Sequence, residues 1–114
     1  MAKLLSVLLK ILGVSLVLFC LAGCMSSQMQ LQQGQKAFEL QHYDESFKLL
    51  LPLAQEGNTE AQYAVGYSYY YGKGVVEDQA KGQYWINKAA SKGYPLAIRA
   101  LEIEATHVRS TPNP

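Results

Sequence analysis

Histidine and cysteine are scarce in this chain, and their scarcity excludes several kinds of site. The 114 residues contain two histidines, His42 and His107, and two cysteines, Cys20 and Cys24. Neither histidine has a second metal-ligating side chain at helical or loop spacing, so we expect no metal site. No serine has a recognisable base, and no pair of carboxylates is spaced for acid–base catalysis. We therefore expect no enzyme activity and no cofactor.

Charge is also sparse, and it is balanced. The chain has 10 basic and 9 acidic residues, with a formal net charge of +1 at pH 7. A nucleic-acid-binding surface needs a basic patch or stripe, and the sequence has none, so nucleic acid is excluded as a partner. The segment Gly72-Lys73-Gly74 is too short for a phosphate-binding loop and is interpreted as a turn.

A long apolar run lies near the start of the sequence. Lys3 and Lys10 precede Ile11–Ala22, a nearly unbroken apolar stretch of 12 residues. This length fits the core of a signal peptide and is short for a membrane span. The alternative is an uncleaved transmembrane helix over residues 4–22, which would bury Lys10 at a cost of roughly 2.5–3.5 kcal/mol. The pattern therefore favours a signal helix.

The apolar run ends in Leu21-Ala22-Gly23-Cys24, which resembles the lipobox of bacterial lipoprotein precursors. The resemblance implies cleavage between Gly23 and Cys24, which removes a signal peptide of residues 1–23. It also implies that Cys24 carries a diacylglycerol group and an amide-linked acyl chain such as palmitate, which anchor the protein to a membrane. We then expect a cell-envelope protein that faces the periplasm. Met25 in place of an aspartate favours the outer membrane.

Three segments follow the predicted cleavage site. Residues 24–33 are largely polar and uncharged and are interpreted as a tether, whose last nine residues would reach about 30 Å when fully extended. Residues 34–105 hold the repeats described next. Residues 106–114 contain two prolines and few apolar side chains, which predicts a flexible tail.

An internal repeat of 36 residues organises the chain after the tether. Gly57 and Gly93 are 36 residues apart, and so are Ala61 and Ala97. Apolar periodicity predicts helices over residues 31–41, 44–56, 59–71, 78–92 and 95–107. Short loops between them imply antiparallel neighbours. The predicted fold class is all-α: a short α/α solenoid of antiparallel helical hairpins, about five helices in all, after the N-terminal signal helix.

Helix-end signals set the boundaries of these helices. Asp44, Asn58 and Asp78 are predicted to begin helices, because their short polar side chains can accept from the first backbone N–H groups. Gly57 is predicted to end the second helix in a left-handed conformation.

Residues 57–93 resemble one full SEL-one-like repeat, a relative of the tetratricopeptide repeats. Residues 34–56 resemble a degenerate preceding unit, and residues 94–105 resemble the first helix of a following one. The resemblance implies that Gly66 lets two helices approach closely and that Trp85 fills the space between neighbours. The motif residues are Ala61, Gly66, Tyr69, Gly72, Gly74, Asp78, Trp85, Ala89, Ala90 and Gly93.

Two residues depart from the repeat pattern. Gly82 occupies a position where alanine is usual, which should cost roughly 1 kcal/mol in a helix interior. Glu102 occupies the position where Gly66 would recur, so we interpret the last helix as a terminal cap with a polar outer face. About two and a half units are few for a solenoid, so a partner or self-association could complete the core.

The predicted helix 59–71 is rich in tyrosine, and its five tyrosines cannot all be buried on one face. The motif assigns Tyr69 to the core. Exposed tyrosines suit protein recognition, because each offers apolar area with a polar tip. Packing between hairpins explains them equally well. If there is a partner-binding surface, we predict that it consists of Tyr63, Tyr67, Tyr70 and Tyr71, with Gln62 as a polar contact.

The functional hypothesis is a lipid-anchored periplasmic adaptor or scaffold that binds a protein or peptide of unknown identity. An alternative is an inhibitor or immunity protein that blocks a secreted toxic effector. A third is an envelope enzyme or sugar-binding factor, against which the absent acid–base pair argues.

Overall fold

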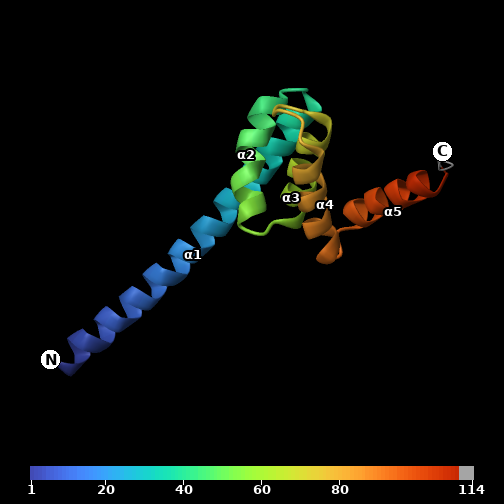
Figure 1. Ribbon diagram of the computed structural model, residues 1–114. Helices are drawn as coiled ribbons and strands as arrows, with labels where there is room; N and C mark the ends of the chain where they lie inside the picture. Colours follow the sequence, from blue (N-terminus) through green and yellow to red (C-terminus); the bar gives the residue numbers. More distant parts are fainter. Residues whose placement is uncertain (111–114) are drawn as a thin grey trace. The chain divides into compact units, whose positions relative to one another are not determined.

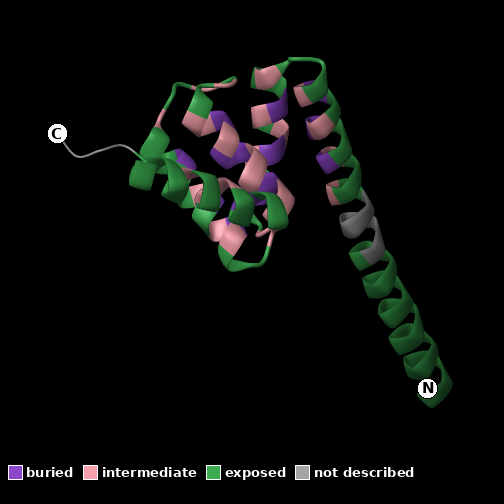
Figure 2. Cartoon of the chain, turned by 90° about the vertical axis from the view of Figure 1, so that its right-hand side faces the viewer, coloured by how far each residue is buried: buried purple, intermediate pink, exposed green. Residues whose placement is uncertain are grey.

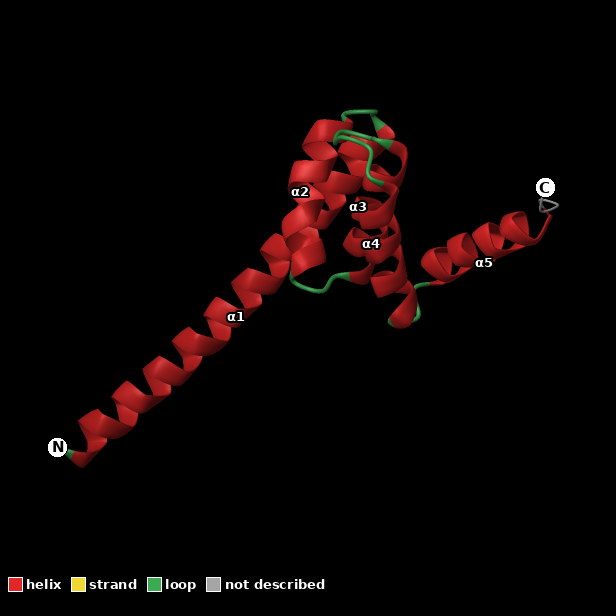
Figure 3. Ribbon diagram, viewed as in Figure 1, coloured by secondary structure: helices red, strands yellow, loops and turns green. Residues whose placement is uncertain are grey.

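The computed structural model describes the backbone of residues 1–110 and the side chains of residues 1–20 and 26–110. Within residues 1–110 the chain forms helices and no strand (Figures 1 and 3). The all-α fold class is therefore confirmed. The predicted cleavage and lipidation residues, Gly23 and Cys24, lie outside the part whose side chains are described. The helices are α1 (Ala2–Glu39), α2 (Tyr43–Gln55), α3 (Thr59–Tyr71), α4 (Gln79–Ser91) and α5 (Pro95–Ser110).

The chain divides into two units, Met1–Gln30 and Leu31–Pro114. In the first unit, the stretch Ala2–Cys20 is long and apolar enough to cross a membrane, with a mean hydropathy of 2.2. Each side chain of residues 1–20 is exposed, which leaves these residues green in Figure 2. A signal sequence and a membrane-spanning helix share these properties, so the length and hydropathy of the stretch agree with both.

Most of the predicted tether is helical. Residues 26–33, the part of it with described side chains, are helical and belong to α1. Glutamine, methionine and leucine are good helix formers, and no proline interrupts them, which accounts for the helix. The tether interpretation stays a prediction, with a helical backbone over these residues, and the first predicted helix begins earlier than residue 31.

In the second unit, α1 ends with a left-handed residue that is not glycine. Gln41 has a φ of 63°, and the His42 N–H donates to the Ala37 carbonyl at 2.9 Å. This six-residue closure is the Schellman arrangement, in which glycine is usual because it has no Cβ. The predicted helix over 31–41 therefore stops at Glu39.

The last turns of α1 pack on α2 through a glycine. A Cβ on Gly34 would lie 2.5 Å from Leu50 Cδ2, so the Leu50 side chain packs directly on the glycine and would have to move for a larger residue. The Ser46 hydroxyl donates to the Gly34 carbonyl at 2.8 Å and is itself fully buried. These contacts place the end of α1 in the role of the first helix of the degenerate unit.

Successive helices pack against each other, α2 on α3, α3 on α4 and α4 on α5. The resulting architecture is the predicted short solenoid of helical hairpins. Burial is concentrated in the hairpins in Figure 2, because their apolar faces point at one another. The first buried cluster consists of Leu31, Leu50, Leu53, Ala54, Ala61 and Val65. The second consists of Ile86, Ala89 and Ala97.

Side-chain caps begin two helices as predicted and fail at a third. The Oδ1 atom of Asn58 accepts from the N–H three residues on at 2.9 Å, and Asp78 Oδ1 does the same at 3.0 Å. The cap position of α2 is His42, whose side chain makes no cap hydrogen bond. Asp44 lies inside the first turn, where its negative charge favours the helix N-terminus. The prediction of Asp44 as a cap is wrong.

Gly74 is required in the turn between α3 and α4. Its φ is +72°, and a Cβ there would overlap the carbonyl group of Tyr43. Both the left-handed backbone and the close approach therefore exclude other residues.

Helix α5 differs from the expected terminal cap at both its end and its face. It continues to Ser110, so residues 106–110 are helical instead of part of a flexible tail, and residues 111–114 lie outside the described backbone. Glu102 is exposed, as a terminal helix requires. The prediction of a polar outer face is incomplete, because several apolar side chains of α5 are exposed as well. They are Leu96, Ile98, Ile103 and Val108.

Candidate functional site

A groove runs across the second unit between the end of α1, α3 and α5. It consists of two cavities of about 490 and 670 Å³. Tyr63, Tyr67 and Leu96 line both cavities, so the two adjoin. We call this feature the tyrosine groove and define it by Gln35, Phe38 and Glu39 of α1, Glu60, Tyr63, Ala64, Tyr67, Tyr70 and Tyr71 of α3, Tyr94 of the loop before α5, and Leu96, Arg99, Ala100, Ile103, Glu104 and His107 of α5.

The 36-residue repeat explains why α3 and α5 face the same groove. Five lining residues of α3 have a counterpart in α5 that lines the groove too. The α5 residues were missed by sequence reasoning, although extending the repeat register from the tyrosines would have found them. The pairs are Glu60 and Leu96, Tyr63 and Arg99, Ala64 and Ala100, Tyr67 and Ile103, and Tyr71 and His107.

The four predicted tyrosines lie together in the groove, and the Tyr71 ring contacts the rings of Tyr67 and Tyr70. Tyr67 is central: its ring centroid is 4.6 Å from that of Tyr71 and 5.7 Å from that of Phe38 on α1. Tyr71 also contacts Tyr70 at 5.0 Å. Offset and edge-on ring pairs of this kind add roughly 0.5–1.5 kcal/mol each beyond burial. These packed rings therefore form one apolar surface.

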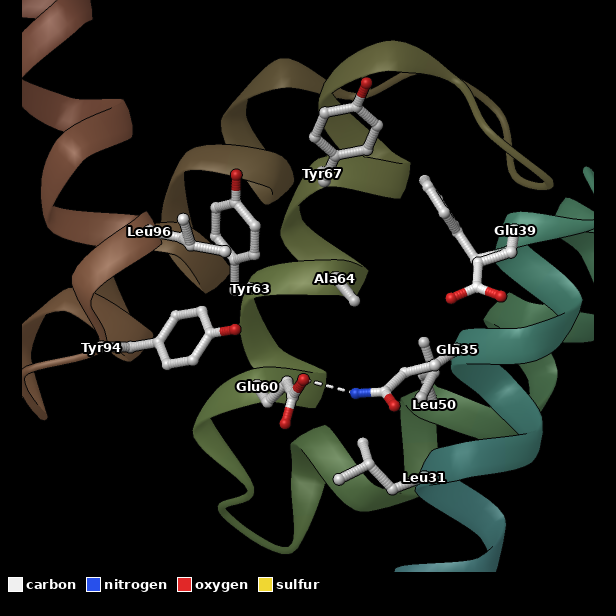
Figure 4. Close-up of a pocket in the computed structure, with 11 residues that line it drawn as sticks. Leu31, Gln35, Glu39, Leu50, Glu60, Tyr63, Ala64, Tyr67, Tyr94 and Leu96 are labelled. Atoms are coloured by element: carbon white, nitrogen blue, oxygen red, sulfur yellow. Dashed lines mark hydrogen bonds between the residues drawn. The ribbon is translucent and has the colours of Figure 1, made fainter.

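Tyr63 and Tyr94 pair at the α1 side of the groove, with ring centroids 5.5 Å apart. Figure 4 shows the Tyr94 hydroxyl pointing toward α3, on the side of Glu60, whereas the Tyr63 hydroxyl points away from Glu60. Burial raises the pKa of both phenols above 10.0, and the nearby Tyr67 adds to the rise for Tyr63, as Glu60 does for Tyr94. Both hydroxyls therefore stay protonated at neutral pH and can donate or accept hydrogen bonds.

The carboxylate of Glu60 is held by a neutral partner. The Gln35 side-chain amide donates to Glu60 Oε1, which is the dashed line in Figure 4. This bond joins α1 to α3 across the groove floor. It fixes the orientation of the carboxylate without neutralising its charge.

On the α5 side of the groove, the carboxylate of Glu104 joins three helices. The Tyr70 hydroxyl donates to Glu104 Oε1 at 3.3 Å, and the Gln83 amide donates to the same oxygen at 2.6 Å. The charge of Glu104 raises the pKa of Tyr70. This network links α3, α4 and α5, so Tyr70 has a structural role besides lining the groove.

Gln62 does not lie in the groove. Its side chain is fully buried, and its amide nitrogen donates to the Ala54 carbonyl at 3.0 Å. The prediction of Gln62 as a polar contact for a partner is wrong, because position 62 points back toward α2. Its Oε1 atom is buried and has no hydrogen-bond partner.

The motif tyrosine and tryptophan lie away from the groove. Tyr69 packs edge-on against Phe47 at 5.1 Å, and both Tyr69 and Trp85 border the first buried cluster. Lys88 Nζ lies 5.2 Å from the Trp85 ring. Among the other motif residues, Ala61 and Ala89 are fully buried, and Ala90 borders the second cluster. Gly72 and Gly93 have positive φ values.

The two histidines have different surroundings. His42 Nδ1 lies 3.8 Å from an exposed Glu45 carboxylate oxygen, whereas His107 lines the groove. Within the described side chains, no group of three or more His, Cys, Asp or Glu residues could hold a metal ion.

Comparison with known proteins gives a repeat family for part of the chain. Residues 59–94, which include α3, the turn and α4, match the model of the Sel1 repeat. The resemblance to this repeat is thereby confirmed for that segment.

Three curated proteins are each similar over about half of the chain. The chain is 41% identical over 59 residues to ERAD-associated E3 ubiquitin-protein ligase component HRD3A of Arabidopsis thaliana, which covers 51% of this chain and 9% of that protein. It is 41% identical over 51 residues to component HRD3B of the same plant, 44% of this chain and 8% of that protein. It is 38% identical over 58 residues to chitin synthase regulatory factor 3 of Schizosaccharomyces pombe, 51% of this chain and 6% of that protein. The chain therefore spans less than a tenth of each relative and shares with them a segment of Sel1 repeat sequence.

Proposed function

We propose that this protein is a membrane-anchored adaptor whose tyrosine groove holds a segment of another protein. The main support for this proposal is the groove itself, in which packed tyrosine rings from one helix present apolar area together with hydroxyl groups. Tyrosine-rich, pre-formed surfaces are typical of protein recognition, because rigid rings lose little conformational freedom on binding.

The similar proteins support a binding role without catalysis. Two of them are named as a component of a ubiquitin ligase and the third as a regulatory factor. Such names describe proteins that act through others. For this chain, they support an adaptor over an enzyme.

The anchor in this proposal is lipid on Cys24, at the periplasmic side of the outer membrane. The apolar stretch Ala2–Cys20 is suited to a signal sequence. Two or more acyl chains hold a protein at a membrane far more durably than one. Anchoring would raise the effective concentration of the groove near partners at the same surface, which strengthens weak binding.

Crosslinking in the native envelope tests the adaptor proposal. Full-length protein would be crosslinked and purified as wild type, Tyr67→Ala and Tyr84→Ala. Tyr84 is the matched control because its side chain is 56% exposed on α4, outside the groove. We expect one dominant partner that is lost with Tyr67→Ala and retained with Tyr84→Ala, at equal protein level and equal helix content. Equal capture by both variants would overturn the groove as the binding site.

A further inference from the structure

The tyrosine groove differs in charge between its two sides, since only the α5 side has basic residues in its lining. On the α1 side, the cavity is lined by Glu39 and Glu60 and by no basic residue. On the α5 side, the cavity is lined by Arg99 and His107, together with Glu104. Tyr63 and Tyr67 line both cavities and separate the two sets of charges.

On the α1 side, the negative charge is left largely uncompensated. Glu60 receives a hydrogen bond from the neutral Gln35 amide, and residues 26–110 contain no ion pair to its carboxylate. Glu39 lies 3.3 Å from Lys36, but both side chains are about two-thirds exposed. Exposed pairs of this kind interact weakly. Figure 4 shows Glu39 and Glu60 on either side of Gln35 at the edge of the cavity.

On the α5 side, the positive charge of Arg99 is free. Its guanidinium makes no ion pair or hydrogen bond within residues 26–110 and is exposed at the groove. Glu104 lines the same cavity, but one of its oxygens accepts from both Tyr70 and Gln83. Both donors are neutral and leave the charge of Glu104 in place, but they hold its carboxylate at the contact between the helices, and no ion pair joins it to Arg99 within residues 26–110. The Arg99 guanidinium can therefore still meet a ligand, with His107 about two helical turns farther along α5.

We infer that the occupant of the groove is an extended polypeptide segment with an apolar or aromatic middle, a lysine or arginine toward Glu60, and a carboxylate toward Arg99. This inference rests on the proposed adaptor function and specifies its partner by charge. The middle of the segment packs on Tyr63 and Tyr67. The cation replaces the missing partner of Glu60, and the carboxylate forms a bidentate pair with the Arg99 guanidinium.

Polypeptide fits this arrangement better than other ligand classes. The two cavities, about 490 and 670 Å³, are each within the usual range for ligand sites and together hold several side chains. Nucleic acid has no cation to meet Glu60, and an acyl chain has no charge for either side. A peptide segment carries both charges at separate positions. Complementary charges at such a site act mainly on selectivity and orientation, while the tyrosines supply apolar burial.

Selection from a random peptide display library tests the inference, because it samples every combination of charged and apolar residues. The full chain would be presented in nanodiscs of neutral phosphatidylcholine, as wild type, Glu60→Gln and Arg99→Gln. Glutamine keeps a hydrogen-bonding group at each position and removes the charge. Glu102→Gln and Arg109→Gln are matched controls, because both residues are exposed on α5 outside the groove.

We expect peptides enriched on the wild type to carry a cation and an acid on opposite sides of apolar residues. Glu60→Gln should remove the preference for the cation alone, and Arg99→Gln the preference for the acid alone. Each variant should weaken binding of a synthesised wild-type peptide by about tenfold, the scale of one hydrogen bond to a charged group. The two controls should leave sequence preference and affinity unchanged.

Three results would overturn the inference. The first is enrichment of peptides without charge preference, or the same preference in both groove variants and wild type. The second is that no peptide is enriched. The third is enrichment of this chain's own segments, which would make a second copy the occupant. If crosslinking finds a partner that depends on Tyr67 while the peptides show no charge preference, the adaptor function stands and the charge pattern fails.

Discussion

The carbonyl oxygen of Gly66 occupies the space into which a side chain on Gly82 would project. A Cβ on Gly82 would lie 2.9 Å from that oxygen, and a Cβ on Gly66 would lie 3.0 Å from the Gly82 oxygen. Helices α3 and α4 therefore approach backbone to backbone at this point. Gly82 therefore permits this contact, which accompanies the helix-propensity cost expected of a glycine in a helix interior.

Gly82→Ala should destabilise the protein, although alanine is the better helix former. Alanine gains roughly 1 kcal/mol of helix propensity, but its Cβ would lie 2.8 Å from both the N and Cβ atoms of Tyr70. Overpacking against backbone costs about 1–3 kcal/mol. We expect a net loss of about 1 kcal/mol, the middle of the resulting range, measured by urea unfolding. The control is Ala80→Gly on the exposed face of α4, which measures the effect of helix propensity alone. A Gly82→Ala variant more stable than the wild type would contradict the close approach.

Gln41→Gly should stabilise the end of α1. Relief of the left-handed conformation at Gln41, whose φ is 63°, is worth roughly 1–2 kcal/mol for a residue with a Cβ. The added freedom of glycine in the unfolded chain takes back about 0.4–1 kcal/mol. A gain of about 0.5–1 kcal/mol in the free energy of unfolding is expected. Gln41→Ala serves as the control and should show no such gain.

Two substitutions of Gln62 should show whether its side chain serves the buried core or contacts a partner. Gln62→Ala leaves a cavity beside Ala54, and we expect a loss of about 2–4 kcal/mol in urea unfolding. Gln62→Met keeps the volume and removes both the hydrogen bond to Ala54 and the unpartnered Oε1 atom. These two effects largely cancel, so its stability should stay within about 1 kcal/mol of wild type. Partner capture by Gln62→Met should match the wild type, and a selective loss of capture would restore Gln62 as a contact residue.

The Tyr70–Glu104 contact should be visible in a tyrosine titration. The negative charge of Glu104 raises the pKa of Tyr70 above 10.0, with smaller contributions from burial, the hydrogen bond, Tyr71 and Glu77. The raised pKa favours the neutral phenol in the folded state. Its contribution to stability is therefore complete below pH 10 and is lost as pH rises through the raised pKa.

Glu104→Gln should lower the pKa of Tyr70 toward 10.0. Ultraviolet difference titration, with Tyr70→Phe subtracted in each background, isolates this phenol. Glu102→Gln removes an equal charge from the exposed side of α5 and should leave the titration unchanged. An identical Tyr70 titration in Glu104→Gln and wild type would show that the two groups do not interact in solution.

The lipid anchor predicts a difference between the two cysteines. Cys24→Ser should abolish incorporation of labelled palmitate and shift the protein to an unprocessed, heavier chain, because serine lacks the nucleophilic thiolate. Cys20→Ser is the matched control and should be labelled and processed like the wild type. Equal labelling of the two variants would rule out Cys24 as the acylated residue and favour a retained N-terminal helix.

Local signals in the sequence predicted local structure well. The sequence correctly predicted the bounds of α3, the caps at Asn58 and Asp78, and the Sel1-type segment. Each of these features depends on residues within a few positions of one another. The left-handed backbone of Gln41 could not be predicted, because glutamine has no preference for that conformation. The longer α1 and α5 were missed because polar, helix-forming stretches look like linkers when their neighbours are unknown.

By itself, the sequence determined the helical repeat and the concentration of tyrosines on α3, because periodicity and composition act along one helix. The tertiary structure decided which face of α3 is open. It turned Gln62 inward, paired Gly66 with Gly82, and brought Glu60 and Arg99 to opposite sides of the same groove. These relationships depend on how α1, α4 and α5 pack around α3. The approach of helices distant in sequence is set by the whole core, and no single segment contains it.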